Sequence, residues 1–318
     1  MKKKINSIFI FLFLSFVIIS VFTSSKVLNE TISFSISIFL KNVFPSLFPM
    51  FIISSILISI GIPTFLGNLF SKINNFLFKT TNYASFVFFM SMITGYPSNA
   101  KYVKELIDEN LISKKEATKI LLYTSFPNPL FIINTVGVLF FNDITIGIKL
   151  YISLFLGNIL VGILFRDIYL ENTKKENYLP FTKNLKQLHD NINKTNIVKT
   201  FLNSISSSVM TLLNIFGTIT CFLIIISFVN EIISLNELSK NLMTGILEFT
   251  SGLKATSLSS LPFNIKVYLS IFFLCFGGLC VHAQILSILD KIKINYGLFL
   301  FSRIIHGLLG IIFMFIFL

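Results

Sequence analysis

Charged residues are scarce in this sequence, at 13% of 318 residues against 54% hydrophobic residues, and the mean hydropathy is +0.82. A soluble domain is excluded because the apolar residues form long uncharged runs and not the stripe of a surface helix. Runs without any charge cover residues 5–25, 42–71, 120–142, 205–230 and 267–289. Each is long enough to cross a bilayer as a helix, so we predict an all-α, polytopic membrane protein with about seven to eight spans.

Acidic residues are also few, with 14 Asp and Glu against 26 Lys and Arg, which gives a net charge of +12. Such an excess can indicate nucleic-acid binding, but no RNA-binding motif accompanies it. The basic residues lie instead at the ends of the apolar runs, as the positive-inside rule describes. We therefore expect the lipid bilayer as the surroundings of the chain and no nucleic acid as a partner.

Cysteine is rare, and the three cysteines, Cys221, Cys275 and Cys280, all lie inside apolar runs. They have neither metal-ligand spacing nor the pattern of a disulfide framework, so we expect small buried hydrophobic side chains. Catalytic motifs are missing as well: there is no nucleophile elbow, HExxH motif, phosphate loop or intramembrane aspartate pair. We expect no metal, no cofactor and no enzymatic activity.

The first 23 residues combine Lys2, Lys3 and Lys4 with an apolar core. A cleaved signal peptide is one interpretation, but residues 23–25 make a poor small-residue cleavage site. We favour an uncleaved first span with its N-terminus in the cytoplasm. It is followed by a helix at the membrane interface, and together they make a first segment of residues 1–42.

A broken hydrophobic stretch at residues 86–130 organises the rest of the chain. Its first apolar run stops at Thr94-Gly95-Tyr96-Pro97 and gives way to Asn99 and Lys101, and a second run is interrupted by residues 125–129, which include Asn128. Proline removes a backbone donor and clashes with the preceding helical turn. Backbone freed at membrane depth must be buried in protein or line a wet cavity. Two such breaks close together are typical of the solute sites of transporters.

The second half of the chain repeats this order of elements. A span at 209–229 precedes a broken segment at 242–261, in which we align Thr250-Ser251-Gly252-Leu253 with the first break. The span at 267–289 is interrupted at Gly277-Gly278, and a last span covers 295–318. Between the halves, residues 167–200 are polar and are predicted to be a solvent-exposed linker. The repeats are thus 43–166 and 201–318.

The distribution of charge gives the two repeats opposite orientations. With the N-terminus inside, four crossings return the lysine-rich linker 167–200 to the cytoplasm. The second repeat then starts from the inside, whereas the first starts from the outside. An inverted-topology repeat of broken, re-entrant helices is the architecture of many secondary transporters.

Ionisable residues at membrane depth are expensive and are functional candidates. Lys101 follows the first break and either meets an anion at a helix N-terminus or snorkels at the cytoplasmic edge. Lys254 has the matching place after Gly252. Arg303, three residues before His306, either pairs with Glu248 or lines an anion path. The predicted substrate-binding residues are Gly95, Tyr96, Pro97, Asn99, Lys101, Asn128, Glu248, Gly252, Lys254, His282, Gln284 and Arg303.

These motifs also carry a resemblance to a known family. The residues are Phe48-Pro49, the run TGYPSNAK at 94–101, FPNPLF at 126–131, the segment 247–254, and 278–284, which ends in VHAQ. Together they resemble the YlbJ (SpoVV) family of sporulation integral membrane proteins over residues 40–318. The family usually has Gly at the position of Asn99 and Thr-Ser-Asn-Pro near residues 125–129, so the local contacts there differ.

The resemblance implies paired gate domains similar to those of concentrative nucleoside transporters. It further implies a transporter that moves dipicolinic acid from the mother cell across the outer forespore membrane during spore maturation. Lys101, Lys254, His282 and Arg303 would neutralise the carboxylates of this small dianion. The alternatives are a nucleoside or other metabolite transporter and a non-transport membrane scaffold for spore assembly. Energy coupling and oligomeric state, including a homo-oligomer, stay open.

Overall fold

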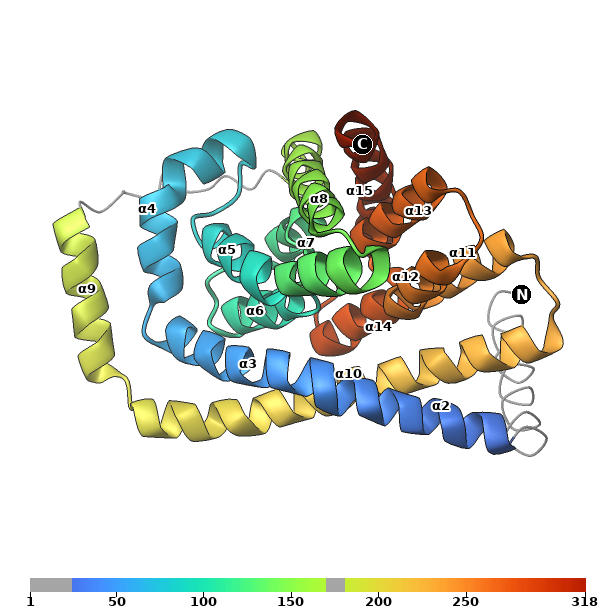
Figure 1. Cartoon of the computed structure of the whole chain (residues 1–318). Coiled ribbons are helices and arrows are strands. Elements are labelled where there is room, and N and C mark those ends of the chain that lie inside the picture. The colour runs from blue at the N-terminus through green and yellow to red at the C-terminus, as the bar shows by residue number, and fades with distance from the viewer. Residues whose placement is uncertain (1–24, 170–180) are drawn as a thin grey trace, which may run out of the picture.

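The computed structural model describes residues 25–169 and 181–318, and every regular element in these ranges is helical (Figure 1). The predicted all-α class is thereby confirmed. The predicted first span lies outside the described residues, except for its last residue. The elements of the first half are α2 (Ser25–Ile38), η1 (Phe39–Val43), α3 (Phe44–Ser59), α4 (Ile62–Leu77), α5 (Ala84–Thr94), α6 (Ser98–Asp108), α7 (Lys114–Tyr123), η2 (Phe131–Phe140) and α8 (Ile144–Leu164).

The second half begins after the undescribed residues 170–180. Its elements are α9 (Phe181–Lys194), α10 (Ile197–Ile232), α11 (Glu237–Leu247), α12 (Phe249–Leu258), α13 (Phe263–Phe276), α14 (Gly278–Leu289) and α15 (Tyr296–Phe317). Asn196 caps α10 by accepting a hydrogen bond from the Lys199 backbone N–H at 3.0 Å. Asp143 caps α8 in the same way, and the hydrogen bond from the Thr145 backbone N–H lowers the pKa of its carboxyl.

Among the described residues, four segments are long and apolar enough to cross a membrane: α8, α10, α13 with α14, and α15. A fifth crossing is added if α2 and α3, which are bent by 46°, form one span. The chain is an integral membrane protein, and the predicted spans at 209–229, 267–289 and 295–318 each match one of the four. At 11 and 10 residues, α5 and η2 are shorter than the roughly 20 needed to cross alone. The predicted total of about seven to eight spans stays a prediction.

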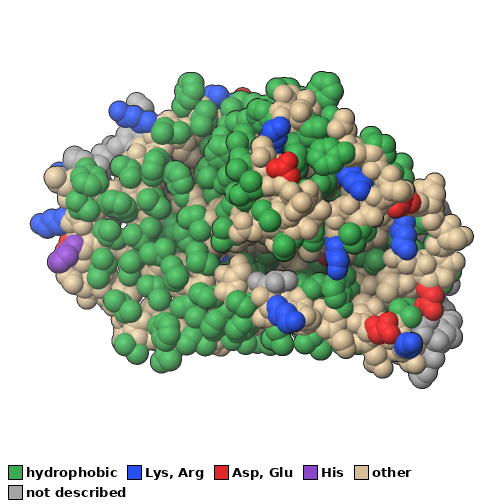
Figure 2. Space-filling model, viewed as in Figure 1, with side chains coloured by type: hydrophobic (Ala, Val, Ile, Leu, Met, Phe, Trp, Pro, Cys, Tyr) green, Lys and Arg blue, Asp and Glu red, His purple; other side chains and the backbone are tan. Residues whose placement is uncertain are grey.

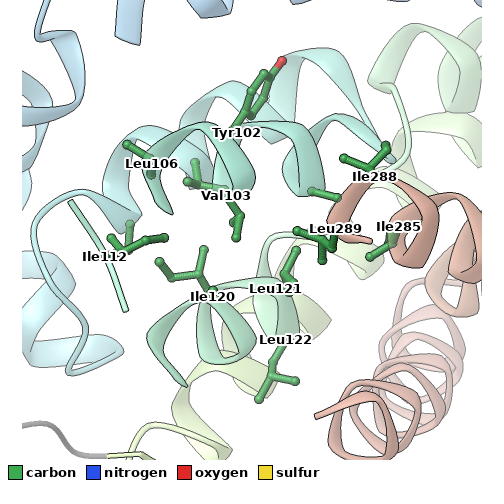
Figure 3. Close-up of a cluster of buried hydrophobic side chains, with 14 of the residues drawn as sticks. Tyr102, Val103, Leu106, Ile112, Ile120, Leu121, Leu122, Ile285, Ile288 and Leu289 are labelled. Atoms are coloured by element: carbon green, nitrogen blue, oxygen red, sulfur yellow. The ribbon is translucent and has the colours of Figure 1, made fainter. Parts of the chain in front are cut away.

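The helices form two groups in Figure 1. The long α10 packs along α2 and α3 on one side, and α8, α13 and α15 pack together on the other. Between them, α6, α7 and α14 share a core in which Val103 points toward Ile120 and Leu121, with Leu289 beside them (Figure 3). This core holds the first hairpin, α5 with α6, in the middle of the molecule.

The outer surface fits lipid surroundings. Figure 2 shows hydrophobic side chains gathered over the left of this face, where α4 lies in the same view, and Lys and Arg side chains standing singly elsewhere. Along α10, Val198, Leu202 and Met210 are each at least 60% exposed. A soluble protein rarely exposes so much apolar surface, whereas a lipid-facing helix requires it.

The polar segment 167–200, predicted to be a linker, includes one whole helix among the described residues, and most side chains of this helix are exposed. This helix is α9, which packs against α4. Asn184 is buried, donates to the Phe65 carbonyl at 3.1 Å and accepts from the Asn68 side chain at 3.0 Å. The two amide hydrogen bonds fix α9 without the apolar core that an independent domain would need.

We expect Asn184→Ala to release α9 from α4. The change removes two hydrogen bonds at a buried position, worth about 1–2 kcal/mol. The open form should then be populated about fivefold to thirtyfold more often, and trypsin should cut after the exposed Lys183 and Lys186 faster by that factor. The matched control is Asn193→Ala, because Asn193 is exposed and its side-chain amide bonds to His189 of the same helix. Equal cleavage rates in the two variants would contradict the role of Asn184.

Candidate functional site

The first hairpin ends on the break between α7 and η2. Gly95 has φ +81°, and a Cβ placed on it would lie 2.5 Å from the backbone nitrogen of Asn128. The Tyr96 backbone N–H donates to the Phe126 carbonyl at 2.5 Å. Asn128 in turn caps η2, since its Oδ1 accepts from the Leu130 backbone N–H at 2.8 Å. Both predicted breaks of the first half are therefore confirmed, and they are in direct contact.

The second hairpin is broken at Glu248, which corrects the predicted break at Gly252. Glu248 has extended backbone angles, φ −139° and ψ 110°, and its carboxylate accepts from the backbone N–H groups of Thr250 at 3.0 Å and Ser251 at 2.7 Å. A carboxylate at this position caps the helix and complements its dipole. Gly252 lies inside α12, where its Cβ would come 2.1 Å from the Cα of Gly245. Gly252 therefore allows α12 to pack closely against α11 and does not mark a break.

The break between α13 and α14 receives the second hairpin. Gly277 and Gly278 have φ +85° and +70°, so the predicted interruption is confirmed. A Cβ on Gly278 would lie 3.0 Å from the backbone nitrogen of Phe249 and 3.3 Å from the carbonyl oxygen of Leu247. Each hairpin tip thus rests, through a glycine, on the broken helix of its own half.

Tyr96 connects the two halves at this point. Its hydroxyl donates to the Leu274 carbonyl near the end of α13 at 3.3 Å. Its ring meets Phe249 edge-on with ring centres 5.3 Å apart, and Phe249 meets Phe131 of η2 at 5.8 Å. The two hairpin tips and the two helix breaks therefore converge around one tyrosine.

Arg303 lies behind this convergence and is 1% exposed. Its guanidinium donates to the Leu122 carbonyl, to the Ser125 carbonyl at 3.4 Å and to Asn158 Oδ1 at 3.3 Å. These carbonyls belong to the end of α7, where a helix leaves acceptors unpaired and cations are favourable. Arg303 does not pair with Glu248: the ion pairs within the described ranges are Lys79–Asp167 and Lys101–Glu105.

The two histidines of the second repeat, His282 and His306, contact backbone carbonyls at the end of α13. His306 places Nδ1 at 3.1 Å from the Cys275 carbonyl and Nε2 at 2.9 Å from the Leu154 carbonyl. His282 places Nε2 at 2.9 Å from the Phe276 carbonyl. Beside it, Gln284 donates to Cys280 Sγ at 3.3 Å. His282 therefore lies within the seam of α13, α14 and α15, whereas Gln284 bonds to Cys280, which packs in the cluster formed by α3 and α10.

Lys101 and Lys254 occupy different places despite their matching positions in the sequence. Lys101 is 2% exposed and donates to Ser208 of α10 at 3.0 Å, so it does not snorkel at the surface. Lys254 is exposed on α12. Asn99, two residues closer to the tip, donates to Ser125 Oγ at 3.1 Å, while its Oδ1 is buried without a partner in the described structure.

The structure thus brings together about half of the predicted residues. The residues at the tips and breaks are Gly95, Tyr96, Pro97, Asn99, Asn128 and Glu248, with Arg303 behind them; Lys101, Gly252, Lys254, His282 and Gln284 lie elsewhere. The sequence reasoning missed Asn158 and Phe249. Asn158 had a usable signal, since it is a polar residue in the apolar part of α8, which carries Lys149 as its charged residue near the other end. Phe249 had none, because one more phenylalanine among 38 carries no information.

Comparison with known proteins adds one relative. The chain is 30% identical over 266 residues to the sporulation integral membrane protein YlbJ of Bacillus subtilis (strain 168). Over this stretch the chain belongs to the YlbJ family. The alignment covers 74% of the chain and 64% of the relative, so the chain spans less than two thirds of the length of that protein. The resemblance drawn from the TGYPSNAK and VHAQ motifs is confirmed.

Other comparisons give no match. No protein-family model matches the chain, and no solved structure matches it. The printed name of the YlbJ relative describes an integral membrane protein of sporulation and specifies no solute. Any solute must therefore be argued from the residues at the hairpin tips.

We expect Glu248→Ala to loosen the second hairpin tip. The carboxylate caps two backbone N–H groups at a position that is 5% exposed. Loss of a helix cap costs about 1–2 kcal/mol. Denaturant titration of the purified protein in detergent measures the change, and Glu248→Gln is the control because its amide oxygen still accepts a hydrogen bond. If both variants unfold at the same denaturant concentration as the parent, the cap contributes nothing.

Proposed function

We propose that this chain is a membrane transporter that moves dipicolinic acid, a small dianion, from the mother cell across the outer forespore membrane. One observation carries the proposal: the two hairpin tips and the two helix breaks converge around Tyr96. Irregular backbone at membrane depth is tolerated where it is buried in protein or lines a cavity. Secondary transporters bind their solutes at such half-helix ends.

The order of elements supports an inverted repeat of gate-like domains. The series α3, hairpin α5–α6, broken helix α7–η2 and α8 parallels α10, hairpin α11–α12, broken helix α13–α14 and α15. In both series a glycine lets the hairpin tip approach its broken helix, Gly95 in the first and Gly278 in the second. In this proposal the N-terminus is cytoplasmic, both hairpins are re-entrant and the solute binds between them.

The charges near the tips suit an anion. Arg303 is a buried cation whose described partners are carbonyl and amide oxygens, a hydroxyl and the Nδ1 of His306, with no carboxylate among them. The N-terminus of α6 also lies at this region, and helix N-termini favour anions. The N-terminus of α12 already holds the Glu248 carboxylate, so a planar dianion would rely on Arg303 and on the positive end of α6.

A nucleoside transporter is the second candidate, and one feature favours it. Ser98 Oγ and Asn99 Oδ1 are fully buried beside the first tip without a hydrogen-bond partner in the described structure. Neutral hydrogen-bonding groups suit a nucleoside better than a dianion. A membrane scaffold for spore assembly would need no such groups.

Flux into liposomes that contain the purified protein tests the proposal, with dipicolinate and uridine measured in parallel. Saturable dipicolinate flux without uridine flux is the expected result. Uridine flux alone would replace the proposal with the nucleoside transporter. No flux of either solute, with the protein folded and inserted, would overturn both and leave the scaffold.

A further inference from the structure

A buried ion pair on α6 connects the first hairpin to α3 and α10. It takes no part in the contacts at either hairpin tip. Lys101 and Glu105 lie one turn apart on α6, with Lys101 Nζ 3.7 Å from Glu105 Oε1. Lys101 also donates to Ser208 of α10 and lies 4.6 Å from the centre of the Phe51 ring of α3. Ser55 of α3 donates to Glu105 Oε1 at 2.6 Å. The pair therefore lies where α6 meets α3 and α10.

Among residues 25–169 and 181–318, no other charge balances this pair. Residues 44–59 of α3, 84–94 of α5 and 200–230 of α10 contain no Asp, Glu, Lys or Arg. On α6 itself, Lys104 and Asp108 are exposed. The remaining ionisable groups on packed helices have other partners or are exposed: Glu116 accepts from Thr81, Lys119 donates to the Lys79 carbonyl, His282 faces the Phe276 carbonyl, and Lys114 and Lys115 are exposed. The charge state of Glu105 thus decides whether Lys101 has a counter-charge.

The second oxygen of the Glu105 carboxylate accepts no hydrogen bond in the described structure. Glu105 Oε2 is buried and has no hydrogen-bond partner in the described structure, whereas Oε1 is held by Ser55. A buried carboxylate oxygen without a donor is the position at which a proton restores a satisfied, neutral group. Proton binding there leaves Lys101 as an unpaired buried charge, which weakens the hold of α3 and α10 on the hairpin.

We propose that Glu105 is a proton-binding site, and that proton uptake there releases the first hairpin from α3 and α10. A proton from water adds to Oε2, no other bond forms or breaks, and the same proton leaves when the pair with Lys101 forms again. The consequence for transport, coupling of solute movement to protons, rests on the proposed function. The proton site itself does not.

Infrared difference spectroscopy during a pH titration tests the site without any transport. The expected result is a carbonyl band of a protonated carboxylic acid that is lost in Glu105→Gln and kept in Glu109→Gln, an exposed carboxyl on the same helix end. Ser55→Ala leaves Glu105 in place but removes the donor to Oε1, so the midpoint of the same band should move to higher pH. This variant also decides the question if Glu105→Gln does not fold. A band that is unchanged in Ser55→Ala, or that persists in Glu105→Gln, would overturn the assignment.

Liposome flux under a pH gradient tests the coupling. With one proton per solute and no membrane potential, a gradient of one pH unit should support about tenfold accumulation. Glu105→Gln should exchange solute but accumulate none, and Glu109→Gln should behave as the parent. Flux that ignores the gradient in the parent would refute coupling and leave the transporter proposal intact. Absence of all flux would refute the transporter proposal, while the infrared band still decides the proton site.

Discussion

Arg303→Met is expected to destabilise the protein by about 3–5 kcal/mol. The guanidinium satisfies the Leu122 and Ser125 carbonyls and Asn158 Oδ1 at the broken end of α7, all of them buried. Methionine fills a similar volume but donates no hydrogen bond, so these acceptors stay unpaired in an apolar interior. Arg303→Lys should give an intermediate loss, because one ammonium keeps the charge and cannot reach all three acceptors.

Thermal unfolding in detergent measures this effect, followed by loss of the monodisperse peak in size-exclusion chromatography. Ile304→Met is the matched control, since Ile304 is the next residue of α15 and is 39% exposed. Should Arg303→Met unfold at the same temperature as Ile304→Met, the end of α7 does not depend on the arginine. The same purified variants, where they fold, also show whether dipicolinate flux needs the cation.

Gly95→Ala is expected to abolish solute flux and to cost about 3 kcal/mol or more in stability. Gly95 has φ +81° and ψ 171°, a backbone conformation that only glycine adopts readily. An added Cβ would also lie 2.5 Å from the Asn128 nitrogen and 3.0 Å from the Pro127 carbonyl carbon. These are backbone atoms that cannot turn aside, so the hairpin tip must move off the break in α7–η2.

Gly217→Ala is the control for this substitution. Gly217 lies in the middle of α10, and a Cβ on it has no heavy atom within 4 Å. Alanine favours a helix over glycine by up to about 1 kcal/mol, so this variant should be as stable as the parent or more stable. A Gly95→Ala protein that unfolds and transports like Gly217→Ala would mean that the hairpin tip tolerates a displaced backbone.

The breaks marked by glycine and proline could be predicted, and the break without them could not. The breaks at Gly95-Tyr96-Pro97 and Gly277-Gly278 can be recognised in the sequence because glycine and proline are disfavoured inside helices. The break at Glu248 is made by an extended residue whose side chain caps the following helix, and glutamate alone is not a turn signal. The nearby Gly252 drew the alignment to the wrong residue because glycine also serves close helix crossings.

The partners that the buried charges have on other helices were equally out of reach of the sequence. Lys101 and Lys254 follow their breaks at the same spacing, yet the first faces α10 and the second is exposed, because packing around each helix decides which face is covered. Arg303 meets the end of α7, 178 residues away in the chain at Ser125, and not the nearby Glu248. Spacing along one helix predicts local pairs, but it carries no information on contacts between distant helices.

Each hairpin packs on the broken helix of its own half. At the tips, the first and second halves of the chain therefore meet along a line. Across this line, the Tyr96 hydroxyl bond to Leu274 and the ring contact with Phe249 are each worth only about 1 kcal/mol. Within each half, by contrast, glycine brings backbone against backbone, and separation would open buried surface. In the proposed transporter, a solute between the tips would meet only these weak contacts locally, while the halves stay joined where α8 packs on α15 and α10 packs on α3.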